Sequence, residues 1–287
     1  MFFYAGRISL IPSDSLYYVE GKENKLELVE KALMQSFIYP EKYGVNIIHE
    51  PIIHPDYGLI GGYIGRQTIT KIPKYESNKF KKFEDVVYPY VHYFYLKHEQ
   101  VIVVERNTSV FKKEEKVFEY LSNYLNNNIL YPEGLVVYIK PLTEKGEFWK
   151  SLKELGEVHE IHLRFIMPNF LGQAYSNIRE LLLSIKSQTR ADEVEQSFYS
   201  AVGKASIPKD DKFESAIGWI EDGGGEWRLV RKSMGGKTRK VISNRQKLTL
   251  IEQKELVLDN LTTDDLVKII KKLNLGLHSI INKSKGV

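Results

Sequence analysis

The chain has 287 residues, of which 43% are hydrophobic and 27% charged, so it can form one large domain or two domains of ordinary size. It contains no cysteine, which excludes disulfides, thiolate nucleophiles and cysteine-ligated metals and leads us to expect a cytoplasmic protein. No apolar run approaches the length of about 18 residues that a membrane span needs, and the N-terminus lacks the features of a signal peptide. We therefore expect no membrane partner.

Strand and helix patterns alternate through the first 200 residues. Runs of branched and aromatic residues bounded by turn residues predict strands at 2–11, 45–53, 57–72, 86–96, 101–106, 135–139 and 158–167. Apolar residues at helical spacing predict helices at 25–38, 112–127, 144–155 and 175–189, the third capped by Thr143. The lysine-rich stretch 74–85 is interpreted as an exposed connection, and 86–96 with 101–106 as a β-hairpin.

The pattern changes toward strands after residue 200. Residues 200–211 are typical of a linker, so we expect a mixed α/β domain at 1–200 and a basic, hairpin-rich region with a C-terminal helix at 201–287. In this second region we predict a strand at 213–220, a hairpin at 227–242, a further strand at 248–258 beside it, and a helix that begins after Thr262 and Thr263. The expected fold class is α+β, with mixed sheets and packed helices.

Basic residues are concentrated toward the C-terminus. The net charge is only +4, but residues 201–287 hold 17 Lys and Arg against 11 Asp and Glu. Between residues 227 and 251 there is no acidic residue, and this segment supplies the nucleic-acid-binding residues that we predict: Arg228, Arg231, Lys232, Lys237, Arg239, Lys240, Arg245 and Lys247. A two-stranded ribbon that carries such residues can follow a phosphate backbone and fits a major groove. Trp227 either stacks on an unpaired base or anchors a core.

Acidic residues beside the basic segment raise a second possibility. Metal-dependent nucleases hold Mg²⁺ and a water molecule with an acidic residue followed by a Glu/Asp-x-Lys on an adjoining strand. Glu226-Trp227-Arg228, shortly after Glu221 and Asp222, is an imperfect version of this pattern, with Arg in place of Lys. The glycines at 223–225 and 235–236 lack the spacing of a phosphate-binding P-loop, so we exclude nucleotide hydrolysis. A Mg²⁺-dependent nuclease remains an alternative.

The histidines give no metal site. His159 and His162 are three residues apart in a predicted strand and therefore face opposite sides of it, which makes them a poor pair of metal ligands. There is no Gly-x-Ser-x-Gly elbow for a serine nucleophile. We expect no catalytic residue, no metal and no cofactor.

One region resembles a known family. Residues 86–168 run through the hairpin that ends in Gln-Val-Ile-Val-Val-Glu, a helix, the strand Val-Val-Tyr-Ile-Lys-Pro-Leu, a second helix and the strand His-Leu-Arg-Phe-Ile-Met-Pro. This order is similar to that of phage-exclusion proteins of the Rex A type and of related phage-defence proteins. The resemblance implies a dimeric, cytosolic DNA-binding protein that senses replication or recombination intermediates and triggers a second protein, the effector. The resemblance identifies no catalytic residue in this chain.

Three hypotheses follow from the sequence. The leading one is a DNA-binding protein with weak sequence preference that acts as a sensor or accessory subunit in bacterial phage defence. The second is the Mg²⁺-dependent nuclease of a defence system. The third is a protein-interaction subunit whose basic hairpin docks on an acidic partner.

Overall fold

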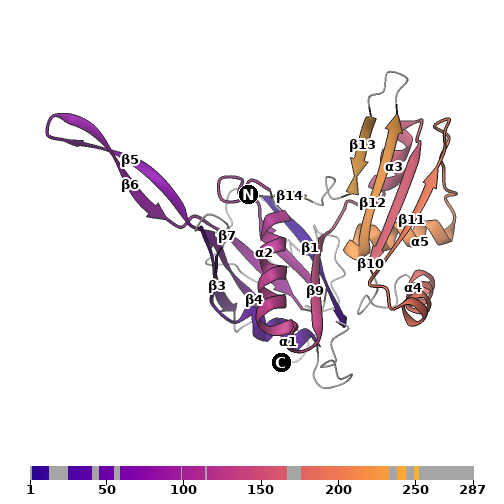
Figure 1. Cartoon of the computed structure of the whole chain (residues 1–287), viewed down its shortest axis with the longest axis horizontal. Coiled ribbons are helices and arrows are strands. Elements are labelled where there is room, and N and C mark those ends of the chain that lie inside the picture. The colour runs from indigo at the N-terminus through magenta and orange to yellow at the C-terminus, as the bar shows by residue number, and fades with distance from the viewer. Residues whose placement is uncertain are drawn as a thin grey trace, which may run out of the picture. The chain divides into compact units, whose positions relative to one another are not determined.

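The chain has the expected α+β fold (Figure 1). The computed structural model describes residues 2–12, 25–40, 45–54, 59–97, 99–113, 115–166, 176–232, 238–243 and 249–251. These residues form two compact units, the first drawn from 1–3, 20–129 and 250–287, the second from 4–19 and 130–249. Residue 200, where we expected a domain boundary, lies inside the second unit. Within the described part of the chain, no helix is long and apolar enough to cross a membrane.

The first unit is built on an antiparallel sheet. Its strands β2 (Phe37–Pro40), β3 (Asn46–His54), β4 (Leu59–Arg66), β7 (Tyr90–Leu96) and β8 (Val101–Glu105) lie in the order β8-β7-β4-β3-β2. The predicted hairpin of β7 and β8 is confirmed, with Leu96 opposite Val101. Helices α1 (Lys25–Leu33) and α2 (Glu115–Leu125) contact each other, and Tyr124 of α2 stacks on Phe37 of β2.

A two-stranded arm extends from this sheet. Strands β5 (Thr68–Glu76) and β6 (Lys79–Val87) pair only with each other and project away from the other strands of the unit (Figure 1). The interpretation of 74–85 as a connection was therefore wrong. Ser77 and Asn78 both have positive φ, at 52° and 58°, which is the backbone of a tight two-residue hairpin turn. We call residues 68–87 the arm.

The second unit contains a four-stranded antiparallel sheet. Strands β10 (Glu160–Ile166), β11 (Glu193–Tyr199), β12 (Gly225–Lys232) and β13 (Thr238–Ile242) lie in the order β11-β10-β12-β13. In the same unit, β9 (Leu135–Pro141) pairs antiparallel with β1 (Phe2–Pro12). The predicted hairpin at 227–242 is confirmed as β12 and β13.

Three helices cover one face of this sheet. Helices α3 (Glu147–Leu155), α4 (Ser176–Thr189) and α5 (Asp211–Trp219) all contribute to one apolar cluster with β10 and β12. The indole of Trp227 is fully buried in this cluster, where it contacts the Phe148 ring edge-on. Trp227 is therefore a core anchor, and it is not available to stack on a base.

Several predicted elements differ from the observed ones. Residues 213–220 were predicted as a strand, but α5 occupies this region, because the Asp210 carboxylate caps the backbone N–H groups of Lys212 and Phe213. The first helix ends at Leu33 rather than at residue 38, and α3 begins after Gly146, so Thr143 is not its cap. These errors arise where a side chain or a glycine sets the end of an element more strongly than apolar spacing does.

The last predicted elements lie at the limit of the described residues. Strand β14 (Thr249–Ile251) is not part of the four-stranded sheet, so the expected pairing beside the β12–β13 hairpin was wrong. Residues 252–258 and the predicted terminal helix after Thr262 lie outside the described residues.

Candidate nucleic-acid interface

The four-stranded sheet of the second unit has a polar face opposite its helices. Side chains alternate along a strand, so the residues of β12 that alternate with the buried Trp227 and Leu229 point away from the core. The strand register places the following side chains on this outer face: Glu160, His162, Arg164, Ile166, Glu193, Glu195, Ser197, Tyr199, Glu226, Arg228, Val230, Lys232, Thr238, Lys240 and Ile242. The outer face is thus a charged surface that contains both signs.

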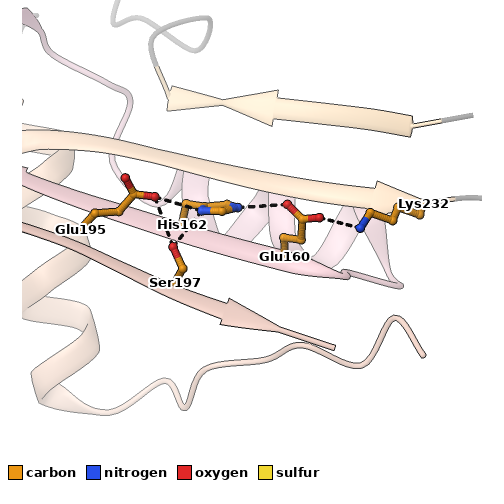
Figure 2. A network of polar contacts seen from close by, with 5 residues as sticks. All are labelled: Glu160, His162, Glu195, Ser197 and Lys232. Carbon is orange, nitrogen blue, oxygen red and sulfur yellow. Dashed lines mark hydrogen bonds and ion pairs between the residues drawn. The ribbon is translucent and has the colours of Figure 1, made fainter. Parts of the chain in front are cut away.

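A chain of polar contacts runs along β10 on the outer face (Figure 2). The Lys232 ammonium lies 2.7 Å from Glu160 Oε1, and Glu160 Oε2 lies 3.1 Å from His162 Nε2. His162 Nδ1 lies 2.8 Å from the Ser197 hydroxyl and 3.1 Å from Glu195 Oε1. The hydrogen bond from Lys232, followed by that with His162, lowers the pKa of Glu160 to about 2. The hydrogen bond with His162 also lowers the pKa of Glu195.

This network does not suit nucleophilic catalysis. Ser197, His162 and Glu160 are joined by hydrogen bonds in the order of a serine triad, but the Glu195 carboxylate lies 3.2 Å from the Ser197 hydroxyl. A carboxylate there would repel the negative charge that develops during attack on a carbonyl, whereas a catalytic serine needs donors at that place. Among the described residues there is also no cluster of three His, Asp or Glu side chains that could hold a metal.

The basic residues of β12 are partly neutralised by carboxylates. Arg231 donates a hydrogen bond to the Leu155 carbonyl over 3.0 Å and lies 3.8 Å from the Glu157 carboxylate. Lys232 is paired with Glu160, as described above. Arg228 is half-buried, and within the described structure its Nε atom makes no hydrogen bond. The basic segment has no acidic residue of its own, but the fold brings carboxylates from β10 and from the turn before it next to its cations.

The exposed cations of the sheet that form no ion pair among the described residues lie on β13, which is an edge strand. Arg239 lies directly opposite Arg231, and Lys240 lies opposite Val230. Both side chains are exposed, and neither makes an ion pair or a side-chain hydrogen bond within the residues that the structure describes. Like charges at directly opposite positions destabilise a strand pair, and the Glu157 carboxylate, 3.8 Å from Arg231, offsets part of this repulsion. Lys237, Arg245 and Lys247 lie outside the described residues.

The carboxylates of the nuclease alternative have structural contacts. Glu221 is buried and accepts hydrogen bonds from the backbone N–H groups of Gly146, at 2.9 Å, and Phe148, at 3.1 Å, at the start of α3. Burial raises its pKa, although these two hydrogen bonds and nearby Lys145 act in the opposite direction. Asp222 forms an ion pair with Lys145 at 2.5 Å. These contacts fix the turn between α5 and β12 rather than leave carboxylate oxygens free for a metal.

Comparison with known proteins gives no relative. No protein-family model, curated protein or solved structure matches the chain. The function must therefore be argued from the residues and their geometry.

Proposed function

We propose that the protein binds DNA with weak sequence preference through the β12–β13 hairpin of the second unit. The observation that supports this proposal is the pair of exposed cations on β13, Arg239 and Lys240, with Arg239 opposite Arg231 on β12. A phosphate group near the two arginines would relieve their repulsion and release a counterion from the DNA. Contacts with DNA phosphates carry no information about the base sequence, which accounts for the weak sequence preference.

The hairpin geometry fits a duplex. Its outer strand β13 lies at the edge of the four-stranded sheet, so side chains of the hairpin can follow a phosphate backbone there, while β12 stays paired with β10. The other charges of the outer face are largely paired with one another, because Glu160 pairs with Lys232 and Glu193 pairs with Arg164. We therefore assign the contact with DNA to the hairpin rather than to the whole sheet.

The test is a titration of fluorescein-labelled 20-base-pair DNA, followed by fluorescence anisotropy, over a potassium chloride series. Arg239→Glu with Lys240→Glu should weaken binding at least tenfold at about 100 mM salt and reduce the slope of log Kd against log salt by about 2. Both side chains are exposed, so the variant should unfold at the same temperature as the wild type.

The matched control changes the same charge elsewhere on the second unit. Lys153 on α3 and Lys212 on α5 are exposed and lie on the helices that cover the sheet rather than on its strands. Lys153→Glu with Lys212→Glu should leave most of the affinity intact. An equal loss in both variants would show that only net charge matters. No binding to DNA at low salt would refute the proposal and favour an acidic protein partner for the hairpin.

The resemblance to phage-exclusion proteins of the Rex A type extends this proposal. It suggests that the DNA-bound protein is a homodimer and that it acts as a sensor or accessory subunit that triggers an effector in phage defence. Light scattering on the purified protein tests the dimer directly. A monomer at micromolar concentration, with and without DNA, would remove that part of the proposal.

A further inference from the structure

The arm is an exposed element that the fold of the first unit does not require. Its strands pair continuously from Thr68 opposite Val87 to Glu76 opposite Lys79, over about 30 Å at the usual rise of a strand. Every residue of the two strands is exposed except Ile72, Phe83 and Val87, which are half-buried. An isolated hairpin is only marginally stable in water, so an exposed one of this length is better explained by a binding role.

The outer half of the arm is positively charged. Beyond Ile72 it carries four lysines and a single acidic residue, Glu76. Lys74 lies directly opposite Lys81, which is the same unfavourable arrangement as that of Arg231 and Arg239 in the other unit. Within the described residues, Lys79, Lys81 and Lys82 form no ion pair, so their charges are available to an anion.

Two aromatic rings lie at the outer end of the arm. Tyr75 and Phe80 occupy directly opposite positions next to the turn, and their ring centroids are 5.1 Å apart. Their side chains are 63% and 81% exposed, although rings of this size are usually buried. By strand alternation, Lys82 lies on the same face as these rings, whereas Lys74, Lys79 and Lys81 lie on the other face.

We propose that the arm binds single-stranded nucleic acid. Tyr75 and Phe80 stack on unpaired bases. The backbone of the bound strand passes around the end of the arm, where its phosphates contact the lysines on both faces. Stacking platforms combined with lysines are the usual means by which proteins bind single strands without sequence preference. A duplex offers the rings nothing to stack on, because its bases are already stacked on each other.

The position of the rings argues against insertion into a membrane. The four residues at the apex of the hairpin, Glu76, Ser77, Asn78 and Lys79, are all polar, so the aromatic pair lies on the side of the ribbon and not at its tip. An element that inserts into lipid would place its apolar residues at the apex.

The test measures binding of a labelled 20-nucleotide single strand and of the matching duplex to the full chain. Tyr75→Ala with Phe80→Ala should weaken binding of the single strand at least tenfold and leave duplex binding unchanged. The matched control is Ile69→Ala with Val86→Ala, an exposed, directly opposed apolar pair on the same face of the arm near its base, which should bind both ligands as the wild type does. Equal binding by the wild type and the aromatic variant would overturn the proposal.

A second variant gives a readout that does not depend on loss of binding. In Phe80→Trp the new indole should be quenched when the single strand is added, because a stacked indole loses its emission, and the duplex should not quench it. The same variant is also mixed with phosphatidylserine vesicles. If the emission of this indole shifts to the blue with vesicles and is not quenched by the oligonucleotide, the arm binds a membrane surface and the proposal is refuted.

The arm proposal stands apart from the proposed function. The aromatic variant of the arm should lose the single strand and keep the duplex, whereas Arg239→Glu with Lys240→Glu should lose the duplex. Failure of either expectation leaves the other one intact, because the two sites lie in different units of the chain.

Discussion

The carboxylate of Glu221 accepts a hydrogen bond from the backbone N–H group of Phe148, which lies 73 residues earlier in the chain. A second bond, from the N–H group of Gly146, completes the cap of α3. The first turn of a helix leaves N–H groups without intrahelical partners, and here one buried side chain satisfies two backbone N–H groups at the start of α3. Glu221 therefore ties the start of α3 to the turn before β12.

The first prediction concerns the loss of this cap. Glu221→Ala should lower the free energy of unfolding by roughly 2 kcal/mol, because two N–H groups near the start of α3 lose their acceptor. Urea denaturation at pH 7 measures this difference. Stability equal to that of the wild type would show that water replaces the carboxylate at the start of α3.

The second prediction concerns the pH dependence of the same residue. Burial raises the pKa of Glu221, so its contribution to stability is fully present below the unfolded pKa of about 4.3 and declines as the pH rises through the folded pKa. Glu221→Gln cannot titrate. The wild type should therefore lose stability relative to this variant between pH 4 and pH 8 in urea titrations, and a relative gain over that range would contradict the direction of the shift.

The third prediction concerns His49 in the first unit. Its Nδ1–H donates to the Gln35 carbonyl over 2.8 Å, so Nε2 accepts from the Tyr93 hydroxyl at 2.5 Å. Burial lowers the pKa of His49 to about 4, so stability due to its neutral form is lost as the pH falls from about 6.5 toward 4. This loss should be on the order of 3 kcal/mol, and a His49→Gln variant should not show it in thermal unfolding across that range.

The fourth prediction concerns the ion pair of Glu160 and Lys232. A double-mutant cycle with Glu160→Gln and Lys232→Gln should give a coupling energy of about 1 kcal/mol at pH 7 and low salt. The pKa of Glu160 is lowered to about 2, so the coupling should persist above pH 4.5 and disappear as the pH falls toward 2. A coupling that does not change with pH would mean that the two side chains interact through packing rather than through charge.

The fifth prediction concerns the close approach of β10 and β12. A Cβ atom on Gly225 would lie 2.0 Å from the Arg164 carbonyl oxygen, so Gly225→Ala must separate the two strands. We expect a loss of about 3 kcal/mol or more in the free energy of unfolding. Gly65→Ala is the control, since its Cβ would meet no atom closer than 3.6 Å, and it should cost under about 1 kcal/mol.

The sequence was sufficient to predict three strands of the second unit, β10, β12 and β13. The strict alternation of the residues at 158–167 and the turn-forming glycines at 235–236 are local sequence patterns. Strands β10, β12 and β13 form where these patterns predict them. Helix α5 was missed because its residues are as compatible with a strand as with a helix, and the Asp210 cap decides between the two. The arm was missed because a lysine-rich composition is typical of loops, although its Ser-Asn turn is a local hairpin signal.

The electrostatics of the candidate site could not be predicted from a local pattern. The segment from Trp227 to Lys247 contains no acidic residue, yet Arg231 and Lys232 lie beside Glu157 and Glu160, which are more than 70 residues earlier in the chain. The pairing of β10 with β12 brings these charges together. Among the described cations of this segment, Arg239 and Lys240 on the outer strand β13 are exposed and form no ion pair.

The division of the chain into two units has a practical consequence for work with fragments. Each unit is assembled from separate stretches of sequence, because residues 4–19 belong with 130–249 and residues 20–129 lie between them in the chain. A fragment that stops at residue 200 would lack β12, and with it the buried Trp227. Neither unit can be released by a single proteolytic cut or expressed as one contiguous piece.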